Sequence, residues 1–397
     1  MRNRSIGLTL FSGLAILVAA CSSGGSASPS SAATAAPPAS VPAASAGSAA
    51  PSAGASAAHS DLKIGVVTDI GTLNDKNYNE YSFKGAQEGA AAIGAAAPTS
   101  IVPASASEYA ADIKNFADQK FDVIVTVGFN LASATVQAAH DNPNIWFVGV
   151  DQSPICVTAD GLPDSTFGCK GDAKTLLPKY ISLGFQEDQA GYLAGIVAAG
   201  ASKSGEIGAI GGTSICAPCV RYIQGYALGA ASVNSAIKVD TAYVTNDFSA
   251  AAFQDQPGGK LYAQTFLGKF PKVDVLFQVA GLTGNGILDA ACAKNINGIG
   301  VDVDQFVSYT NADKCLLTSA EKHLQIAVSS TLKAIADGTA TPGDALYDAK
   351  NDGIGASPGH DKASAWAADT QAKLDAALAA MKAGTLKTCP TNCGSAK

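Results

Sequence analysis

The stretch from Leu62 to Thr68 reads LKIGVVT and is followed directly by Asp69. It is short, rich in β-branched residues and almost continuously apolar, which is the pattern of a strand buried on both faces of a parallel sheet. Two further runs have the same form: Val123 to Val127 (VIVTV), which ends at Gly128, and Ile145 to Val150 (IWFVGV), which ends at Asp151. Helix-like stretches lie between them. The sequence therefore predicts repeated βα units, with helices covering both faces of a parallel sheet.

The same pattern starts again in the second half of the chain. A long helix is expected from Gln186 to Ala201, and it separates the two halves. The strand-like runs that follow it are 205–212, 239–244, 273–279 and 298–303. About 335 residues follow residue 60, which suits two domains better than a single core. We therefore predict an α/β protein of two doubly wound parallel-sheet lobes with a cleft between them.

The first residues of the chain have the form of an export and attachment signal. Arg2 and Arg4 precede an apolar run from Ile6 to Ala20 that is too short to span a bilayer comfortably. The run ends in small residues and Cys21, the arrangement of a bacterial lipobox, in which the cysteine becomes the lipid-bearing first residue of the mature protein. We expect a lipoprotein signal peptide over 1–21 and a protein held at the extracellular or periplasmic face of the cell membrane. The alternative is an ordinary secretory signal with a chance cysteine.

Residues 22–60 are almost wholly Ala, Ser, Pro and Gly. Such a segment has no apolar face to bury, so it cannot offset the entropy lost on ordering. We expect a disordered tether with an end-to-end span of roughly 35 Å. No later stretch is long and apolar enough for a transmembrane helix, so the membrane is expected to be contacted through the lipid anchor only.

Charge and motif content narrow the classes of function. A net charge of −7 and a pI near 5.1 give no basic patch for nucleic acid. No Ser-His-Asp spacing, nucleophile elbow, metal-ligand cluster or phosphate-binding loop is visible in the sequence. We therefore expect no catalytic residues, no metal and no cofactor, and predict that the chain is not an enzyme.

Eight of the nine cysteines remain once Cys21 is set aside. They fall in neighbouring pairs: Cys156 and Cys169, Cys216 and Cys219, Cys292 and Cys315, and Cys389 and Cys393. An even set in an exported chain indicates disulfides, and sequential pairing is our hypothesis. Two alternatives stay open for Cys216 and Cys219: a zinc site, which would need two more ligands, and a thioredoxin-like redox centre.

Four stretches, in this order, resemble the basic membrane protein family of lipoproteins, whose best-known members are purine nucleoside receptors of ABC importers. They are 67–79 with Gly85, 205–212 with 225–226 and 229–230, 280–286 (AGLTGNG), and 299–305 (IGVDVDQ) followed by 317–319 and Lys322. The resemblance implies a type I periplasmic-binding-protein fold with a hinge, in which the chain crosses between the lobes more than once. Lobe 1 would comprise 61–185 plus about 305–335, and lobe 2 would comprise 186–304 plus about 336–390.

Candidate site residues follow first from strand ends, because ligands of open parallel sheets bind beyond the carboxyl ends of the strands. This rule selects Asp69, Gly128, Asp151, Gly212, Gly281 and Asp302. Gly281 would allow close approach of the backbone to a ligand. Phe129, next to Gly128, is a candidate cleft aromatic, with core packing as the alternative.

The resemblance assigns roles to several residues. Asp69 would contact the ligand from lobe 1, and Tyr78 stands where the family has a phenylalanine that stacks on the base. Asn79 offers a donor and an acceptor to a base edge. Asp302 matches the acidic position that binds the ribose hydroxyls, and Lys322 matches the cleft lysine that donates to the same sugar. Helix caps, turn carboxylates and surface side chains are the structural alternatives for these positions.

The expected function is that of a lipid-anchored substrate-binding protein of an ABC importer, which captures a nucleoside, a purine by preference, as its lobes close. Its partners would be the small-molecule ligand and an ABC permease, and we expect a monomer that does not bind nucleic acid. A second stacking aromatic is not placed by the pattern; Phe277 and Phe248 are the candidates. Alternatives are a sensor or accessory protein on the same fold, or a binder of a small sugar or a free base.

Overall fold

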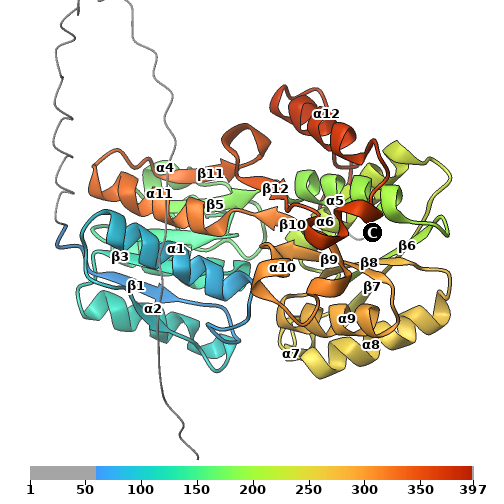
Figure 1. Cartoon of the computed structure of the whole chain (residues 1–397). Helices are drawn as coiled ribbons and strands as arrows, with labels where there is room; N and C mark the ends of the chain where they lie inside the picture. The colour runs from blue at the N-terminus through green and yellow to red at the C-terminus, as the bar shows by residue number, and fades with distance from the viewer. Residues whose placement is uncertain (1–59, 396–397) are drawn as a thin grey trace, which may run out of the picture. The chain divides into compact units, whose positions relative to one another are not determined.

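The computed structural model describes residues 60–395. The expected signal peptide, Cys21 and the tether up to residue 59 lie outside the described residues. Within the described part of the chain, two six-stranded sheets carry the fold, each with helices on both faces (Figure 1).

The first sheet has the strand order β2-β1-β3-β4-β5-β11, and all of its pairings are parallel. Its strands are β1 (Ile64–Val67), β2 (Thr99–Ile101), β3 (Val123–Val127), β4 (Trp146–Val150), β5 (Tyr180–Phe185) and β11 (Gly343–Tyr347). Alternate residues of a strand point to opposite faces, and here both faces are buried. This double burial explains the continuous apolar runs of the sequence.

The second sheet repeats this order as β7-β6-β8-β9-β10-β12. Its strands are β6 (Glu206–Thr213), β7 (Lys238–Thr245), β8 (Val275–Val279), β9 (Asn297–Asp302), β10 (Leu316–Lys322) and β12 (Ile354–Ala356). The pairing of β12 with β10 is antiparallel and the others are parallel. The predicted doubly wound architecture is confirmed, and each strand of one sheet has a positional counterpart in the other.

The helices form separate layers on the two faces of each sheet. They are α1 (Tyr78–Ala92), α2 (Tyr109–Asp118), α3 (Ala132–Asp141), α4 (Ala173–Leu176), α5 (Glu187–Ala201), α6 (Ala217–Val233), α7 (Ala250–Phe253), α8 (Gln256–Lys269), α9 (Gly281–Ala293), α10 (Gln305–Ser308), α11 (Leu324–Ala336) and α12 (Thr370–Lys382). On the first sheet, α1 and α11 bury one face, and α2 and α3 bury the other. On the second sheet, α5, α6 and α12 share one core, and α8 and α9 share the opposite one.

The chain crosses between the lobes at three places: after β5, after β10 and after β11. The lobe boundaries therefore differ from those expected, because 305–322 stays in lobe 2 and β11 belongs to lobe 1. The buried strand β10 continues the second sheet beside β9. Only then does α11 pack on α1, close enough that a Cβ at Gly85 would lie 2.8 Å from Gln325 Cα. These contacts set the return to lobe 1 later than the resemblance suggested.

The three crossing segments are hydrogen-bonded to one another. The backbone N–H of Gln186 in the first crossing donates to Tyr347 O at 3.0 Å, and that of His323 in the second donates to Gly353 O at 3.0 Å. In addition, Ala349 N donates to the side-chain oxygen of Gln189 at 2.8 Å. The crossings thus lie side by side and are joined across the hinge.

Helices α5 and α6 approach each other unusually closely, through glycines. A Cβ at Gly225 would lie 2.0 Å from Asp188 O, and one at Gly229 would lie 1.9 Å from Tyr192 O. Only glycine permits such an approach of two helix backbones. The pair therefore forms a fixed unit, and the first residues of both helices point toward the space between the two sheets.

The eight cysteines of the described region form four disulfides in the sequential pairing expected: Cys156–Cys169, Cys216–Cys219, Cys292–Cys315 and Cys389–Cys393. Helix α6 starts at Ala217, with Pro218 in its first turn and Cys216 as its N-cap. Between residues 60 and 395, no helix has the length and apolar character needed to cross a membrane.

Candidate functional site

A cavity lies where the carboxyl ends of the two sheets face each other. Nine residues predicted from the sequence line it: Asp69, Tyr78, Asn79, Gly128, Phe129, Asp151, Gly281, Asp302 and Lys322. Their convergence follows from topology, since the ends of parallel strands meet along one edge of each sheet. Gly212 does not line the cavity. The ring of Phe253 covers it, with Cε1 2.5 Å from where a Cβ would stand.

A buried lysine joins the two lobes at the base of the cavity. Lys322, at the end of β10 in lobe 2, donates from Nζ to Asp151 Oδ2 of lobe 1 at 2.6 Å. The same ammonium lies 3.5 Å from Asp302 Oδ1. Asp151 and Asp302 both have a left-handed backbone, with φ of 59° and 64°. They stand at the ends of β4 and β9, the fourth strands of the two sheets, so they are positional counterparts.

A second ion pair lies behind this lysine. Glu187, at the first position of α5, is fully buried, and Arg221 Nε donates to its Oε2 at 2.6 Å. The other Glu187 oxygen is 3.8 Å from Lys322 Nζ. The cluster thus contains the carboxylates of Asp151, Asp302 and Glu187, but only the two cations Lys322 and Arg221. This excess of negative charge is held in a desolvated site.

Burial and charge act against each other in this cluster. Burial disfavours the charged ammonium of Lys322, but attraction to Asp151, Asp302 and Glu187 outweighs burial and raises its pKa. Burial also raises the pKa of Asp302, and Lys322 offsets that rise only in part. The pKa of Glu187 is likewise raised by burial, against the attraction of Arg221 and Lys322. Lys322 therefore remains charged, and its attraction offsets part of the cost of burying Asp302 and Glu187.

Aromatic rings surround the same ammonium. Lys322 Nζ lies 5.1 Å from the ring centroid of Tyr78, 5.4 Å from that of Phe185 and 5.8 Å from that of Tyr222. Tyr222 also donates its hydroxyl to Asp302 Oδ1 at 3.1 Å. Charge and apolar faces are therefore adjacent, which suits a ligand with a hydroxylated part and a flat part.

Asp69 is held differently, by donors of its own lobe. Its carboxylate accepts from the Tyr109 hydroxyl, from Ile70 N at 2.8 Å and from Asn130 Nδ2 at 3.3 Å. Burial raises its pKa, and these hydrogen bonds oppose the rise. Gly128, with φ of 114°, passes so close that a Cβ there would lie 2.8 Å from Asp69 Oδ2. The carboxylate is thus fixed in place before any ligand arrives.

The positions of Phe248 and Phe277 decide which of them can serve as the second aromatic of the cavity. Phe248 lines the cavity, and its ring centroid lies 4.8 Å from that of Phe129 on the opposite lobe. Phe277 is fully buried in the core of lobe 2 against Tyr226 and does not reach the cavity. Phe277 was therefore the wrong candidate, because β8 points its side chain toward α6 instead of the cleft.

Several lining residues were not found from the sequence. They include Thr72, Asn130, Pro218, Tyr222, Ser249, Phe253 and Gln254. Cys216 and Cys219, which follow the strand-end Gly212 closely in the sequence, also line the cavity. Asn130 could have been found, since it lies two residues after the strand-end Gly128. Tyr222 carries no such signal, because it reaches the cavity from a helix whose placement depends on its packing against α5.

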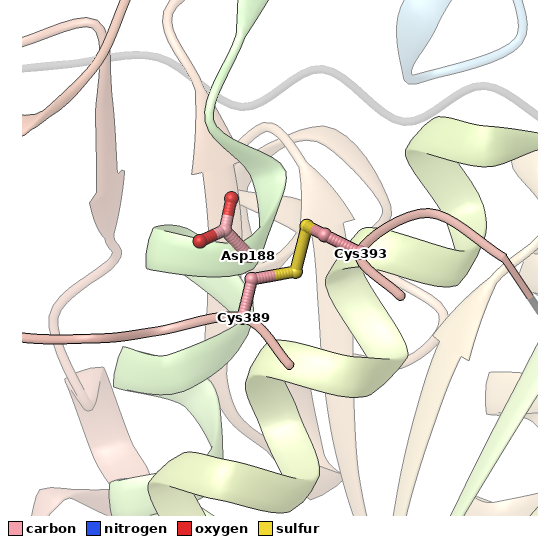
Figure 2. Close-up of side chains that lie close together, drawn as sticks. All are labelled: Asp188, Cys389 and Cys393. Carbon is pink, nitrogen blue, oxygen red and sulfur yellow. A yellow bond between two sulfur atoms is a disulfide. The ribbon is translucent and has the colours of Figure 1, made fainter. Parts of the chain in front are cut away.

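The possible metal sites do not hold up. Within the described residues, one group of three side chains has suitable proximity: Asp188, Cys389 and Cys393 (Figure 2). Both sulfurs are joined in a disulfide, and Asp188 already accepts a hydrogen bond from the Thr388 hydroxyl. The zinc alternative for Cys216 and Cys219 also loses its ligands, because these two sulfurs are bonded to each other.

Two similar sheets with a lined cavity between their carboxyl ends define a solute-binding protein of the periplasmic type I class. Solved structures agree on the fold. An ABC transporter system solute-binding protein from Aeropyrum pernix superposes with a TM-score of 0.68 at 20% identity, over 83% of this chain and 94% of that one.

Comparison of the amino-acid sequence with known families assigns the chain to a family. Residues 62–381 match the Bmp family model, described as ABC transporter substrate-binding protein PnrA-like, and the chain belongs to this family. The ABC transporter nucleoside-binding protein BmpA of Lactococcus lactis is 31% identical over 317 residues, covering 74% of this chain and 81% of BmpA. Basic membrane protein D of Borreliella burgdorferi is 28% identical, covering 74% and 77% of the two chains. The chain is therefore an ABC-transporter substrate-binding protein, not an enzyme.

Proposed function

We propose that this protein captures a nucleoside, with a purine as the preferred base, and delivers it to an ABC permease. The observation that carries the proposal is the junction of Asp151, Lys322 and Asp302 beside the ring of Tyr78. Vicinal ribose hydroxyls can donate to Asp302 and accept from Lys322, while the base lies on an aromatic face. The similarity to a nucleoside-binding protein of Lactococcus lactis supports the same ligand class.

Closure of the lobes would couple capture to release. Asp69, Tyr78 and Asn79 belong to lobe 1, whereas Asp302 and Lys322 belong to lobe 2. A ligand that bonds to both sets is bound more tightly by the closed form and shifts the population toward it. The closed form is then the one that docks on the permease, and the ligand leaves when the lobes separate.

The charge of the cavity favours a nucleoside over a nucleotide. Asp69, Asp75, Asp151 and Asp302 line it, against Lys322 as the cation among the lining residues. A phosphate group would bring further negative charge into a desolvated acidic site, at a considerable electrostatic cost. We therefore expect the free nucleoside to bind at least about 100-fold more tightly than its 5′-monophosphate.

Calorimetric titration of ligand-stripped protein against nucleosides, free bases, sugars and nucleoside monophosphates tests this proposal. Micromolar or tighter binding of a nucleoside, with purines ahead of pyrimidines, is the expected result. Equal binding of the monophosphate would contradict the charge argument. If only sugars bind, the proposed nucleoside ligand is wrong, whereas the family assignment still stands.

We also propose that Cys21 carries a lipid that holds the protein at the outer face of the cell membrane. The supporting observation is the apolar run that ends in small residues and Cys21. Mass spectrometry of the mature N-terminus should find a diacylated cysteine as the first residue. A Cys21→Ser variant should leave the membrane fraction, and its retention there would contradict the proposal.

A further inference from the structure

The turn that connects β1 to α1 crosses to the opposite lobe. Its residues Asp75 and Lys76 precede Tyr78 and Asn79, which line the cavity. Asp75 O accepts a hydrogen bond from Asn285 Nδ2 of α9 at 3.3 Å. The next carbonyl, Lys76 O, accepts from Ser308 Oγ of α10 at 2.8 Å. Two donors of lobe 2 thus bind two consecutive carbonyls of lobe 1.

The lobe 2 side of this contact is a buried chain of amides. Gln305 Nε2 donates to Asn285 Oδ1 at 2.9 Å, and Gln278 Nε2 donates to Gln305 Oε1 at 2.6 Å. Gln305 Oε1 also accepts from Val301 N at 3.1 Å, at the end of β9. All three side chains are at most 1% exposed. Because Asn285 Oδ1 is already used, its Nδ2 is fixed in the orientation that points out toward Asp75.

The lobe 1 side is equally constrained. The Asp75 carboxylate accepts from Asn77 N at 2.9 Å, Asn79 N at 2.9 Å and Glu80 N at 3.1 Å, so it holds the start of α1. Lys76 has φ of 61°, a conformation that a residue with a Cβ adopts at some cost. The turn therefore presents its two carbonyls in one geometry, which fits the two donors of lobe 2.

We propose that Asn285 and Ser308 form an interlobe latch, which favours the closed arrangement independently of the ligand and positions Tyr78 and Asn79. Asn285 of the stretch 280–286 and Gln305 of the stretch 299–305 would then serve to hold the lobes together, in addition to any ligand contact made by their neighbours. Asn285 and Ser308 are positioning residues here, since neither lines the cavity. The inference does not depend on which small molecule binds.

Hydrogen exchange of the ligand-free mature protein, read by mass spectrometry, tests the latch. The variants are Asn285→Asp, which keeps the shape of the side chain and removes the donor, and Ser308→Ala. Loss of one hydrogen bond should accelerate exchange of the amides from 75 to 80 by about three- to tenfold, although the substitutions lie in the other lobe. The same variants should raise the ligand dissociation rate by a similar factor.

Matched controls separate a latch from simple destabilisation. Asn142→Asp removes a donor to Ala138 O within lobe 1, and Ser330→Ala removes a donor to Ile326 O in its own helix. Neither control should alter exchange at 75–80. Unchanged exchange there in both latch variants, or equal acceleration in the controls, would overturn the proposal. If Asn285→Asp unfolds lobe 2, Ser308→Ala decides the question. If no nucleoside binds, hydrogen exchange at 75–80 still tests the latch, because that measurement uses the ligand-free protein.

Discussion

The two lobes share one strand order but hold their site carboxylates in different ways. In lobe 1, Asp69 is bound by three donors of its own lobe. In lobe 2, Asp302 depends on Tyr222 and on Lys322, whose strongest hydrogen bond goes to Asp151 across the cleft. Lobe 1 therefore fixes Asp69 with its own donors alone, whereas the lysine beside Asp302 is shared with Asp151 of lobe 1 and joins the two carboxylates only when the lobes meet. The predictions that follow test this difference.

The largest effect is expected from breaking the bridge between the lobes. Lys322→Met removes the ammonium from among Asp151, Asp302 and Glu187 and leaves these buried carboxylates without their shared cation. Removal of one partner from a buried ion pair typically destabilises by about 3–5 kcal/mol. Denaturant unfolding should show such a loss, and ligand binding should disappear. Lys333→Met, in the exposed pair with Asp337, should change stability by less than about 1 kcal/mol. Near-equal stability of the two variants would contradict the bridge.

Substitution of the two lobe carboxylates should separate affinity from stability. Asp302→Ala should weaken ligand binding by about 2–4 kcal/mol, since it removes a charged acceptor from a desolvated site. Its effect on stability should be small, because carboxylates outnumber cations around Lys322. Asp69→Ala should instead lower stability, as three donors lose their acceptor. Calorimetry and thermal unfolding of both variants measure the contrast. Unchanged affinity in Asp302→Ala would remove this residue from the site.

The titration of Asp75 in lobe 1 should make the stability of the protein depend on pH. Burial raises the pKa of Asp75 from 3.8 to about 6, against the hydrogen bonds from three backbone N–H groups. The folded state therefore holds this proton more tightly than the unfolded chain does. Its stabilising contribution is complete below about pH 4 and declines by roughly 3 kcal/mol as the pH rises to about 6.

The comparison variant for this effect is Asp75→Asn, which cannot titrate. Relative to the variant, the unfolding free energy of the wild type should fall between about pH 4 and pH 6 and stay constant above that range. Urea unfolding at a series of pH values measures it. A flat difference would mean that Asp75 is ionised throughout.

The smallest effect concerns the aromatic face of lobe 1. Tyr78→Ala should weaken nucleoside binding by about 1–3 kcal/mol if the ring stacks on a base. Tyr78→Phe keeps the ring and should stay within about 1 kcal/mol of wild type, since the hydrogen bond of the hydroxyl to Val150 O is long, at 3.4 Å. Isothermal titration of both variants is the measurement. Loss of stability with unchanged affinity in Tyr78→Ala would assign the ring to packing.

Much of the fold was visible in the sequence because both sheets are buried on both faces. The runs around β1, β3 and β4 are apolar, short and bounded by Asp or Gly, and those around β6 and β8 end at or near glycine. The strands β11 (GDALY) and β12 (IGA) lie at sheet edges and contain too few apolar residues to form such a run. Because β11 was missed, the last crossing between the lobes was expected too early in the chain.

The candidate site shows the same division. Asp69, Asp151 and Asp302 could be predicted because a strand end fixes where its next side chain lies. Glu187 and Tyr222 could not, because they lie in the helices α5 and α6 and reach the charge cluster only through the close contact between these helices. Nor does a sequence pattern reveal that Asn285 reaches Asp75, since that contact joins residues far apart in the chain.

The three hydrogen-bonded crossings have a mechanical consequence. A single linker would let one lobe swing, twist and slide relative to the other. Three adjacent linkers, tied by Gln186 to Tyr347 and by His323 to Gly353, resist twisting and sliding and leave bending about one axis. The rims of the two lobes then return to the same alignment in every cycle, as the leaves of a door hinge do. A transporter that recognises both rims at once would find a single, reproducible target.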